Sequence, residues 1–154
     1  FENLTVFENL ELAMDSDKRV FATLFAQLTC LEDESIEVVM EKINLTALSE
    51  ERAGSLSHGQ KQWLEIGMLL MQNAQLLLID EPAAGMTHQE MDKTVELLRA
   101  LKDKHTIIVV EHDMDFVRSL ESPVTVLHQG KVLAEGDMNK IQNDPNVVEV
   151  YLGE

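Results

Sequence analysis

The chain has 154 residues, of which 45% are hydrophobic, so it can form one packed core or part of a larger domain. Its formal net charge is -16, from 28 acidic and 12 basic residues, and no cluster of Lys and Arg suggests a contact with phosphate backbones. We therefore do not expect nucleic acid as a partner. The single cysteine, Cys30, cannot form an internal disulfide, which agrees with a reducing compartment such as the cytoplasm.

No apolar run approaches the about 18 to 20 residues that a membrane-spanning helix needs. The longest apolar runs, Leu76–Ile79 and Ile107–Val110, have the length of strands. The first residues have neither the basic start nor the apolar centre of a signal peptide. We expect a soluble chain, and the missing initiator Met before Phe1 suggests that it was cut from a longer protein.

The first part of the chain has the apolar spacing of three to four residues that is typical of helices. Apolar residues recur in this way from Leu4 to Met14 and from Val20 to Leu28, and Ile36–Leu45 is another amphipathic segment. The polar stretch Thr46–Ser55 is predicted to be a loop. We assign residues 1–72 to a helical subdomain.

Strands and helices alternate after this part, which indicates a parallel sheet with covered faces. The predicted elements are a strand over Leu76–Ile79, a helix over Gln89–Lys102, a strand over Thr106–Val110 and a short helix from Asp113 to Leu120. They are followed by a hairpin of Val124–Leu127 and Val132–Ala134, a short helix capped by Asp137 and ended by Asn143–Pro145, and the apolar residues Val147–Leu152. Residues 73–154 are therefore predicted to form an α/β core with a hairpin.

The segment Leu56–Gln60, Leu-Ser-His-Gly-Gln, lies at the start of a predicted helix with Ser57 as its N-cap. A helix start has free backbone N–H groups, and a hydroxyl and a small residue beside them make it suitable for an anion. A capped helix without a ligand explains these five residues equally well.

Acidic residues follow the first predicted strand in the order Asp80, Glu81, and Pro82 comes next. Ligands of open α/β sheets bind at the carboxyl ends of parallel strands. There Asp80 can face Mg²⁺ through a water, and Glu81 can orient and deprotonate a water aimed at a phosphate. The alternative is a strand that ends in solvated acids. His112 follows the second strand, and it would lie beside both acids, in reach of a terminal phosphate, if the two strands are neighbours.

In this order the motifs resemble those of ABC ATPases, the ATP-driven motors of membrane transporters. Leu56–Gln60 resembles the signature motif, Leu76–Glu81 the Walker B strand, Pro82–Thr87 the D-loop and His112 the switch histidine. The resemblance implies the α/β fold of P-loop NTPases. Within the family, Pro82–Thr87 and the Phe-Glu-Asn-Leu start look most like importer subunits for branched-chain amino acids, amides and urea, and among these most like the urea type.

The resemblance implies a role for each site residue. Asp80 supports Mg²⁺ through water, Glu81 acts as the general base and His112 senses the γ-phosphate of ATP. Two subunits are expected to pair head to tail, so that each contacts the ATP held by the other. The residues implied in this contact in trans are Ser57, His58, Gly59 and Gln60. The other implied partners are transmembrane permease subunits, with the chain on the cytoplasmic face of the plasma membrane.

Two positions depart from the family pattern, and one motif is missing. His58 replaces the first of the paired glycines, and Thr87 stands where the D-loop often has Asp. The phosphate-binding loop Gly-x-x-x-x-Gly-Lys-Ser/Thr is absent, since Gly54–Lys61 has its Lys one residue late and no strand before it. We therefore expect a fragment that is inactive alone and that self-associates through exposed sheet edges and apolar faces.

Two other functions stay open. One is a non-transport ABC ATPase that acts as a mechanical clamp in DNA repair or translation, although a net charge of -16 argues against it. The other is a non-catalytic interaction fragment, which the missing phosphate loop would fit. Trp63 is predicted to pack on its helix rather than to stack on a nucleotide.

Overall fold

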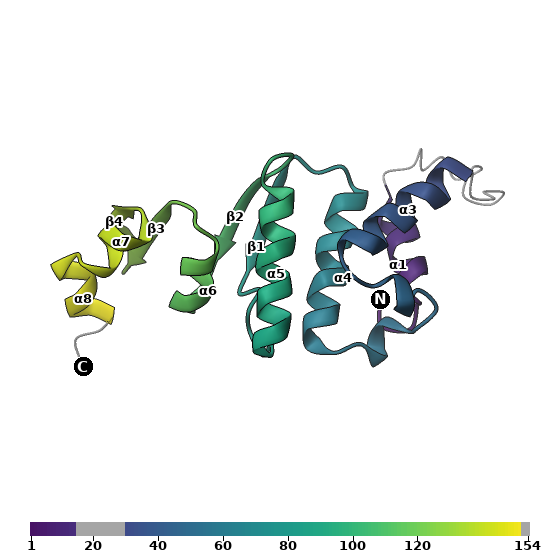
Figure 1. Ribbon diagram of the computed structural model, residues 1–154, viewed down its shortest axis with the longest axis horizontal. Coiled ribbons are helices and arrows are strands. Elements are labelled where there is room, and N and C mark those ends of the chain that lie inside the picture. Colours follow the sequence, from purple (N-terminus) through teal and green to yellow (C-terminus); the bar gives the residue numbers. More distant parts are fainter. Residues whose placement is uncertain (15–29, 152–154) are drawn as a thin grey trace. The chain divides into compact units, whose positions relative to one another are not determined.

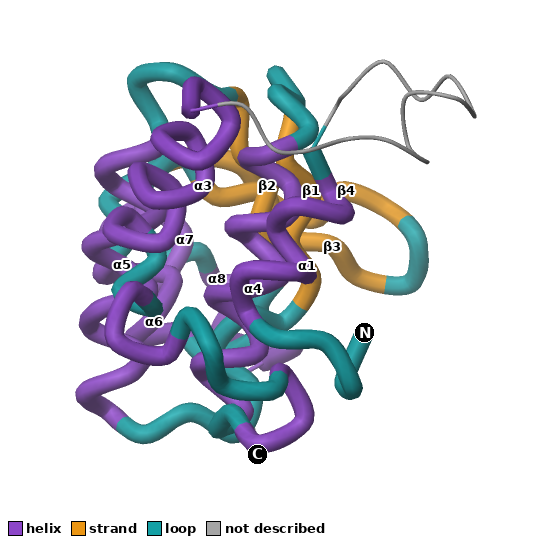
Figure 2. Tube along the Cα trace, turned by 90° about the vertical axis from the view of Figure 1, so that its right-hand side faces the viewer, coloured by secondary structure: helices purple, strands orange, loops and turns teal. Residues whose placement is uncertain are grey.

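The computed structural model describes residues 1–14 and 30–151 (Figure 1). The chain divides into two compact units, Phe1–Val110 and Glu111–Glu154. The helical residues predicted from Val20 to Leu28 lie outside the described part of the chain. Figure 2 distinguishes by colour the helices from the two pairs of strands. Within the described ranges, no helix combines the length and the apolar content that crossing a membrane requires.

Three helices of the first unit pack against one another, and these are α1 (Val6–Ala13), α3 (Cys30–Lys42) and α4 (His58–Met71). Apolar residues at helical spacing on all three are buried, as the sequence pattern predicts. At Gly67 of α4, a Cβ would come within 3.0 Å of Leu10 Cδ2 and 2.6 Å of Ile43 Cδ1. The missing side chain at Gly67 therefore allows α4 to lie this close to the apolar residues of α1 and of the chain after α3.

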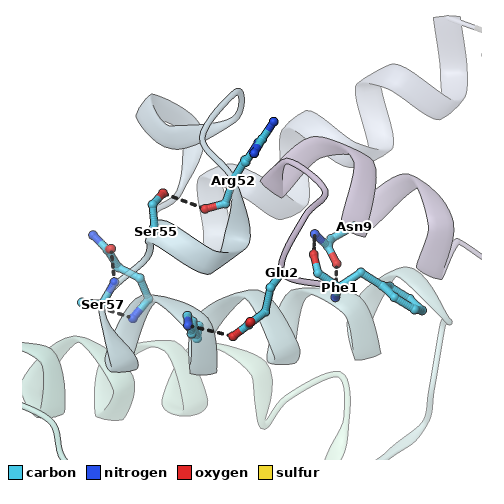
Figure 3. Close-up of polar contacts among 8 residues, drawn as sticks. Phe1, Glu2, Asn9, Arg52, Ser55 and Ser57 are labelled. Atoms are coloured by element: carbon cyan, nitrogen blue, oxygen red, sulfur yellow. Dashed lines mark hydrogen bonds and ion pairs between the residues drawn. The ribbon is translucent and has the colours of Figure 1, made fainter.

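The segment predicted to be a loop, Thr46–Ser55, is confirmed as one, and it contains the short 3₁₀ turns η1 (Thr46–Leu48) and η2 (Ala53–Ser55). The amide of Val6 donates to the carbonyl of Glu51 at 3.0 Å, so this loop is tied to the start of α1. At the same end, the amino group of Phe1 donates to Oδ1 of the buried Asn9 at 2.8 Å (Figure 3). These bonds fix the loop that leads into α4.

The sheet of the first unit consists of β1 (Leu76–Asp80) and β2 (Thr106–Val110), joined by α5 (His88–Leu101). The two strands are parallel, and Asp80 is in register with Val110. Alternate residues face opposite sides, as in any strand. On one side Leu77 and Ile79 are buried, whereas on the other Leu78 is 66% exposed and Val110 is 59% exposed. The predicted parallel βαβ arrangement is confirmed, and one face of this sheet is apolar and open.

The second unit contains α6 (Met114–Ser119), the hairpin strands β3 (Val124–His128) and β4 (Lys131–Gly136), and the helices α7 (Met138–Gln142) and α8 (Pro145–Tyr151). Asp113 and Asp137 cap α6 and α7 through their side chains, as the sequence predicts for Asp137. Both α7 and α8 contact β4, and Ile141 and Val147 are fully buried. The predicted antiparallel hairpin is therefore confirmed.

One helix of the second unit differs from the sequence analysis, which assigns no element to the apolar residues Val147–Leu152. Here α8 begins at Pro145. Proline has no amide proton, and the first residue of a helix needs none, so Pro145 can follow the end of α7 and also start α8. The predicted helical subdomain, 1–72, lies within the first unit together with β1 and β2.

Candidate functional site

The carboxyl end of β1 places two acidic residues side by side. Asp80 is the last residue of the strand and Glu81 follows it, and both are exposed. The amide of Glu81 donates to the carbonyl of Val110 at 2.8 Å, so the pairing of β1 with β2 extends to this point. The two strands are neighbours in the sheet. His112 itself comes two residues after Val110 and belongs to the second unit.

Glu81 has an unusual backbone conformation. Its φ is +46°, which places it in the left-handed region that non-glycine residues occupy at a cost of about 1 to 2 kcal/mol. The strand thus ends abruptly, and the next residues form a tight turn in which the amide of Ala84 donates to the carbonyl of Glu81 at 3.1 Å. Such strained residues concentrate at functional sites, where the surrounding structure holds them in place.

In the second unit, His112 is positioned by the carboxylate of its neighbour Glu111. Oε2 of Glu111 accepts from the amide of His112 at 2.8 Å and from the amide of Asp113 at 3.1 Å. The same oxygen lies 3.5 Å from Nδ1 of His112. The side chain of Glu111 is 1% exposed and that of His112 is 77% exposed. A buried carboxylate thus fixes the backbone of His112, while the imidazole ring is accessible to solvent. Sequence reasoning missed Glu111, and an acidic residue between an apolar strand and a histidine was the available signal.

The segment Leu56–Gln60 starts α4 as predicted. Ser57 is the N-cap, because its hydroxyl accepts from the amide of Gln60 at 3.2 Å. The side chain of Gln60 in turn accepts from the amide of Ser57 at 2.9 Å, which completes a capping box (Figure 3). Gln60 therefore has a structural task at the helix start in addition to any contact with a ligand.

A residue that the sequence analysis did not select, Glu90, joins the start of α4 to the start of α5. The hydroxyl of Ser57 donates to Oε1 of Glu90 at 2.8 Å. Oε2 of Glu90 accepts from the amide of Thr87 at 2.9 Å and from its hydroxyl at 2.8 Å. Thr87 is the N-cap of α5, and the pattern Thr-x-x-Glu of a capping box was the sequence signal for Glu90.

Gly59 belongs to the same group of contacts. A Cβ at Gly59 would lie 2.9 Å from both Cδ and Oε1 of Glu90, so the carboxylate rests against the first turn of α4 at a residue without a side chain. We call Ser57, Gly59, Thr87 and Glu90 the helix-start cluster. Gly59 was predicted to allow the approach of a phosphate, and in this structure it allows the approach of a carboxylate.

Hydrogen bonds lower the pKa of Glu90 below its ordinary value. The amide of Thr87 has the largest effect, followed by the hydroxyls of Ser57 and Thr87, and the charge of His58 contributes in the same direction against a small opposing effect of burial. Glu90 therefore carries a negative charge at neutral pH. His58 also lies against Gly85, where a Cβ would come within 3.4 Å of His58 Cδ2.

The residues present fit a magnesium site of the kind that Mg²⁺ forms with phosphates. Among the described residues, no group of three or more His, Cys, Asp or Glu side chains is arranged to hold a metal ion. Mg²⁺ is commonly bound by one or two carboxylates together with waters and phosphate oxygens, and the exposed Asp80 offers one such carboxylate.

Trp63 is 4% exposed and donates from Nε1 to Thr94 Oγ1 at 2.8 Å, which confirms its predicted packing role.

Comparison with known protein families gives two matches. The family model described as "ABC transporter" matches residues 1–84. The model described as "Branched-chain amino acid ATP-binding cassette transporter" matches residues 131–154.

Curated relatives match nearly the whole chain. The chain is 35% identical to the high-affinity branched-chain amino acid transport ATP-binding protein BraF of Pseudomonas aeruginosa, over 100% of this chain and 64% of that protein. It is 32% identical to the corresponding protein LivG of Escherichia coli, again over 100% of this chain and 64% of the relative. The chain thus spans about 64% of the length of these relatives.

Solved structures agree with this result. An ATP-binding cassette of an ABC transporter superposes with a TM-score of 0.81 at 29% identity, over 97% of this chain and 63% of that chain. The ADP conformation of such a cassette superposes with a TM-score of 0.79 at 28% identity, over 99% of this chain and 64% of that chain. The predicted fold class is therefore confirmed.

Proposed function

We propose that this chain forms part of the ATP-binding and ATP-hydrolysing subunit of an import system. The chain belongs to the ABC transporter family, which is the basis of the proposal. The observation that carries the proposal is the end of β1. There the exposed Asp80 ends a parallel strand and the exposed Glu81 follows it, and the pairing with β2 continues to the Glu81 amide. This is the edge of an open α/β sheet at which ligands bind.

The family resemblance suggests a separate task in ATP hydrolysis for each predicted site residue. Glu81 orients a water and accepts its proton as the water attacks the γ-phosphate of ATP. Asp80 holds Mg²⁺ through water, and the ion when bound neutralises charge on the phosphate oxygens. His112, which is 77% exposed on its Glu111 support, contacts the γ-phosphate.

The start of α4 would complete an ATP site on a second subunit. Its hydroxyl, its glycine and its backbone N–H groups suit an anion, and these groups come from Ser57, His58, Gly59 and Gln60. The 154 residues contain no Gly-x-x-x-x-Gly-Lys-Ser/Thr loop to hold ATP. We place that loop in the part of the relatives that this chain does not cover, so the 154-residue chain alone is inactive.

The partners follow from the same assignment. A second copy of the subunit pairs head to tail with the first, and transmembrane permease subunits contact the helices of residues 1–44. The subunit is then cytoplasmic and lies on the inner face of the plasma membrane. Branched-chain amino acids are the favoured substrate. The names of the family model that matches residues 131–154 and of the two relatives all refer to branched-chain amino acids. The narrower urea-type assignment stays a prediction from the sequence.

The contact in trans can be tested by mixing two variants of the full-length protein whose ATPase activity is impaired. In a head-to-tail dimer of Ser57→Ala with Glu81→Gln, one site loses both groups and the other keeps both. Mixing the two variants should therefore restore part of the ATPase activity that each has lost. A matched mixture of Asp80→Asn with Glu81→Gln places both defects in the same half of each site and should restore none. Absence of recovery in the first mixture would refute the assignment in trans.

A further inference from the structure

We propose that the carboxylate of Glu90 competes with ATP for the hydrogen bond of the Ser57 hydroxyl. Without ATP, Glu90 accepts this bond at the start of α4, and a phosphate of ATP displaces the carboxylate when it binds. This inference rests on the proposed function, because it takes the start of α4 as the place where the phosphate of a partner's ATP binds. It adds a residue to which neither the sequence motifs nor the family resemblance gives a role.

The hydroxyl of Ser57 can donate only one hydrogen bond. A serine hydroxyl has one proton to donate and lone pairs that accept. In this structure the Ser57 hydroxyl donates its hydrogen bond to Glu90 Oε1 at 2.8 Å, and Ser57 Oγ accepts from the amide of Gln60 at 3.2 Å. A phosphate oxygen only accepts at neutral pH, so Ser57 cannot donate to it while its one hydroxyl hydrogen is bonded to Glu90.

Glu90 also occupies space beside the start of α4. The carboxylate of Glu90 rests against Gly59, where a Cβ would lie 2.9 Å from Oε1. It therefore occupies part of the surface that the glycine leaves open for an approaching anion. Two negative groups at such close range repel each other, so the carboxylate and a phosphate exclude each other from this place.

Glu90 is held in place through only one of its two carboxylate oxygens when it releases Ser57. Its second oxygen, Oε2, is bonded to the amide and the hydroxyl of Thr87 at 2.9 Å and 2.8 Å. Oε1 can thus release Ser57 while Oε2 keeps the capping box of α5 intact. Thr87 matters here because it donates its hydroxyl, whereas an ionised Asp at this position would have no proton to donate and would repel Glu90.

The test uses the full-length protein and measures KM and kcat for ATP separately. Glu90→Gln keeps the shape of the side chain and removes its charge, so KM should fall roughly tenfold with little change in kcat. Glu90→Asp withdraws the carboxylate from Ser57 by one methylene group and should change KM in the same direction. The matched control is Glu96→Gln, which neutralises an exposed carboxylate elsewhere on the same helix, α5, and should leave KM unchanged.

Each outcome bears on the inference. A fall in KM that disappears in the Ser57→Ala background supports it, because the effect then acts through Ser57. An unchanged or raised KM in both Glu90 variants, while Ser57→Ala still weakens ATP use, overturns the competitor role and leaves the proposed function standing. If Ser57→Ala has no effect on ATP use, the assignment of α4 fails and the inference fails with it.

Discussion

The side-chain hydroxyl of Ser57 donates a hydrogen bond of 2.8 Å to the carboxylate of Glu90, which lies 33 residues further along the chain. This bond joins the N-caps of two helices, because Glu90 also completes the capping box that Thr87 begins. The segment that resembles the signature motif is therefore tied to the segment that resembles the D-loop. A substitution at the start of either helix should therefore alter the hydrogen bonds at the start of the other.

The depressed pKa of Glu90 predicts how stability depends on pH. Its ionised form stabilises the folded protein above the pKa of the unfolded chain, about 4.3, and this contribution is lost as the pH falls through the lower folded pKa. The free energy of unfolding should therefore fall more steeply for the wild type than for Glu90→Gln below about pH 4. Urea unfolding at a series of pH values measures both. Parallel curves would show that the bonds to Glu90 do not favour its ionised form.

The left-handed backbone of Glu81 predicts an order of stability among its variants. Glycine adopts a φ of +46° without the steric cost that alanine meets, so Glu81→Gly should be more stable than Glu81→Ala by about 1 kcal/mol. Both variants lack the carboxylate and should lack ATPase activity in the full-length protein. Denaturant unfolding gives the stability difference. Equal stability of the two would mean that the strand end relaxes out of this conformation.

The close contact at Gly67 predicts a destabilising substitution in the helical packing. The Cβ of Gly67→Ala would come within 2.6 Å of Ile43 Cδ1, and overpacking of this kind costs about 1 to 3 kcal/mol. Ile43→Val removes the clashing methyl group, so the double variant should recover part of the loss. The free energies of unfolding of the two single variants and the double variant form the required cycle. Strict additivity of the two changes would contradict the packing at this position.

The apolar face of the β1–β2 sheet predicts how the 154-residue chain behaves in water. Leu78 and Ile108 are 66% and 51% exposed on this face, and such a patch favours association. Sedimentation at increasing concentration should show self-association that Leu78→Lys reduces. The matched control is Leu127→Lys, which changes a residue 59% exposed in the second unit. A monomeric wild-type chain at high concentration would count against the prediction, and so would an equal effect of the two substitutions.

Much of the fold follows from local sequence patterns. Helix caps such as Ser57 and Asp137 depend on a side chain and the backbone a few residues away, so their residue types reveal them. The parallel pairing of β1 with β2 follows from two apolar strands joined by a helix. These features need no knowledge of distant contacts.

The features that the sequence did not reveal depend on tertiary contacts or on strain. The bond from Ser57 to Glu90 requires two helix starts to meet in space, and no periodicity encodes that meeting. Glutamate disfavours the left-handed region, so its residue type gives no sign of the conformation of Glu81. The start of α8 at Pro145 was hidden because the same proline also ends the preceding helix pattern.

The most direct test of the account is the ATPase activity of the full-length protein that contains this chain, with and without Glu81→Gln. Replacement of the general base should lower turnover by about 10²-fold or more, while ATP binding and folding are retained. Glu96→Gln serves as the control for the loss of an exposed carboxylate and should turn over ATP at the wild-type rate. Wild-type turnover by Glu81→Gln would contradict the central claim that the end of β1 carries the catalytic base.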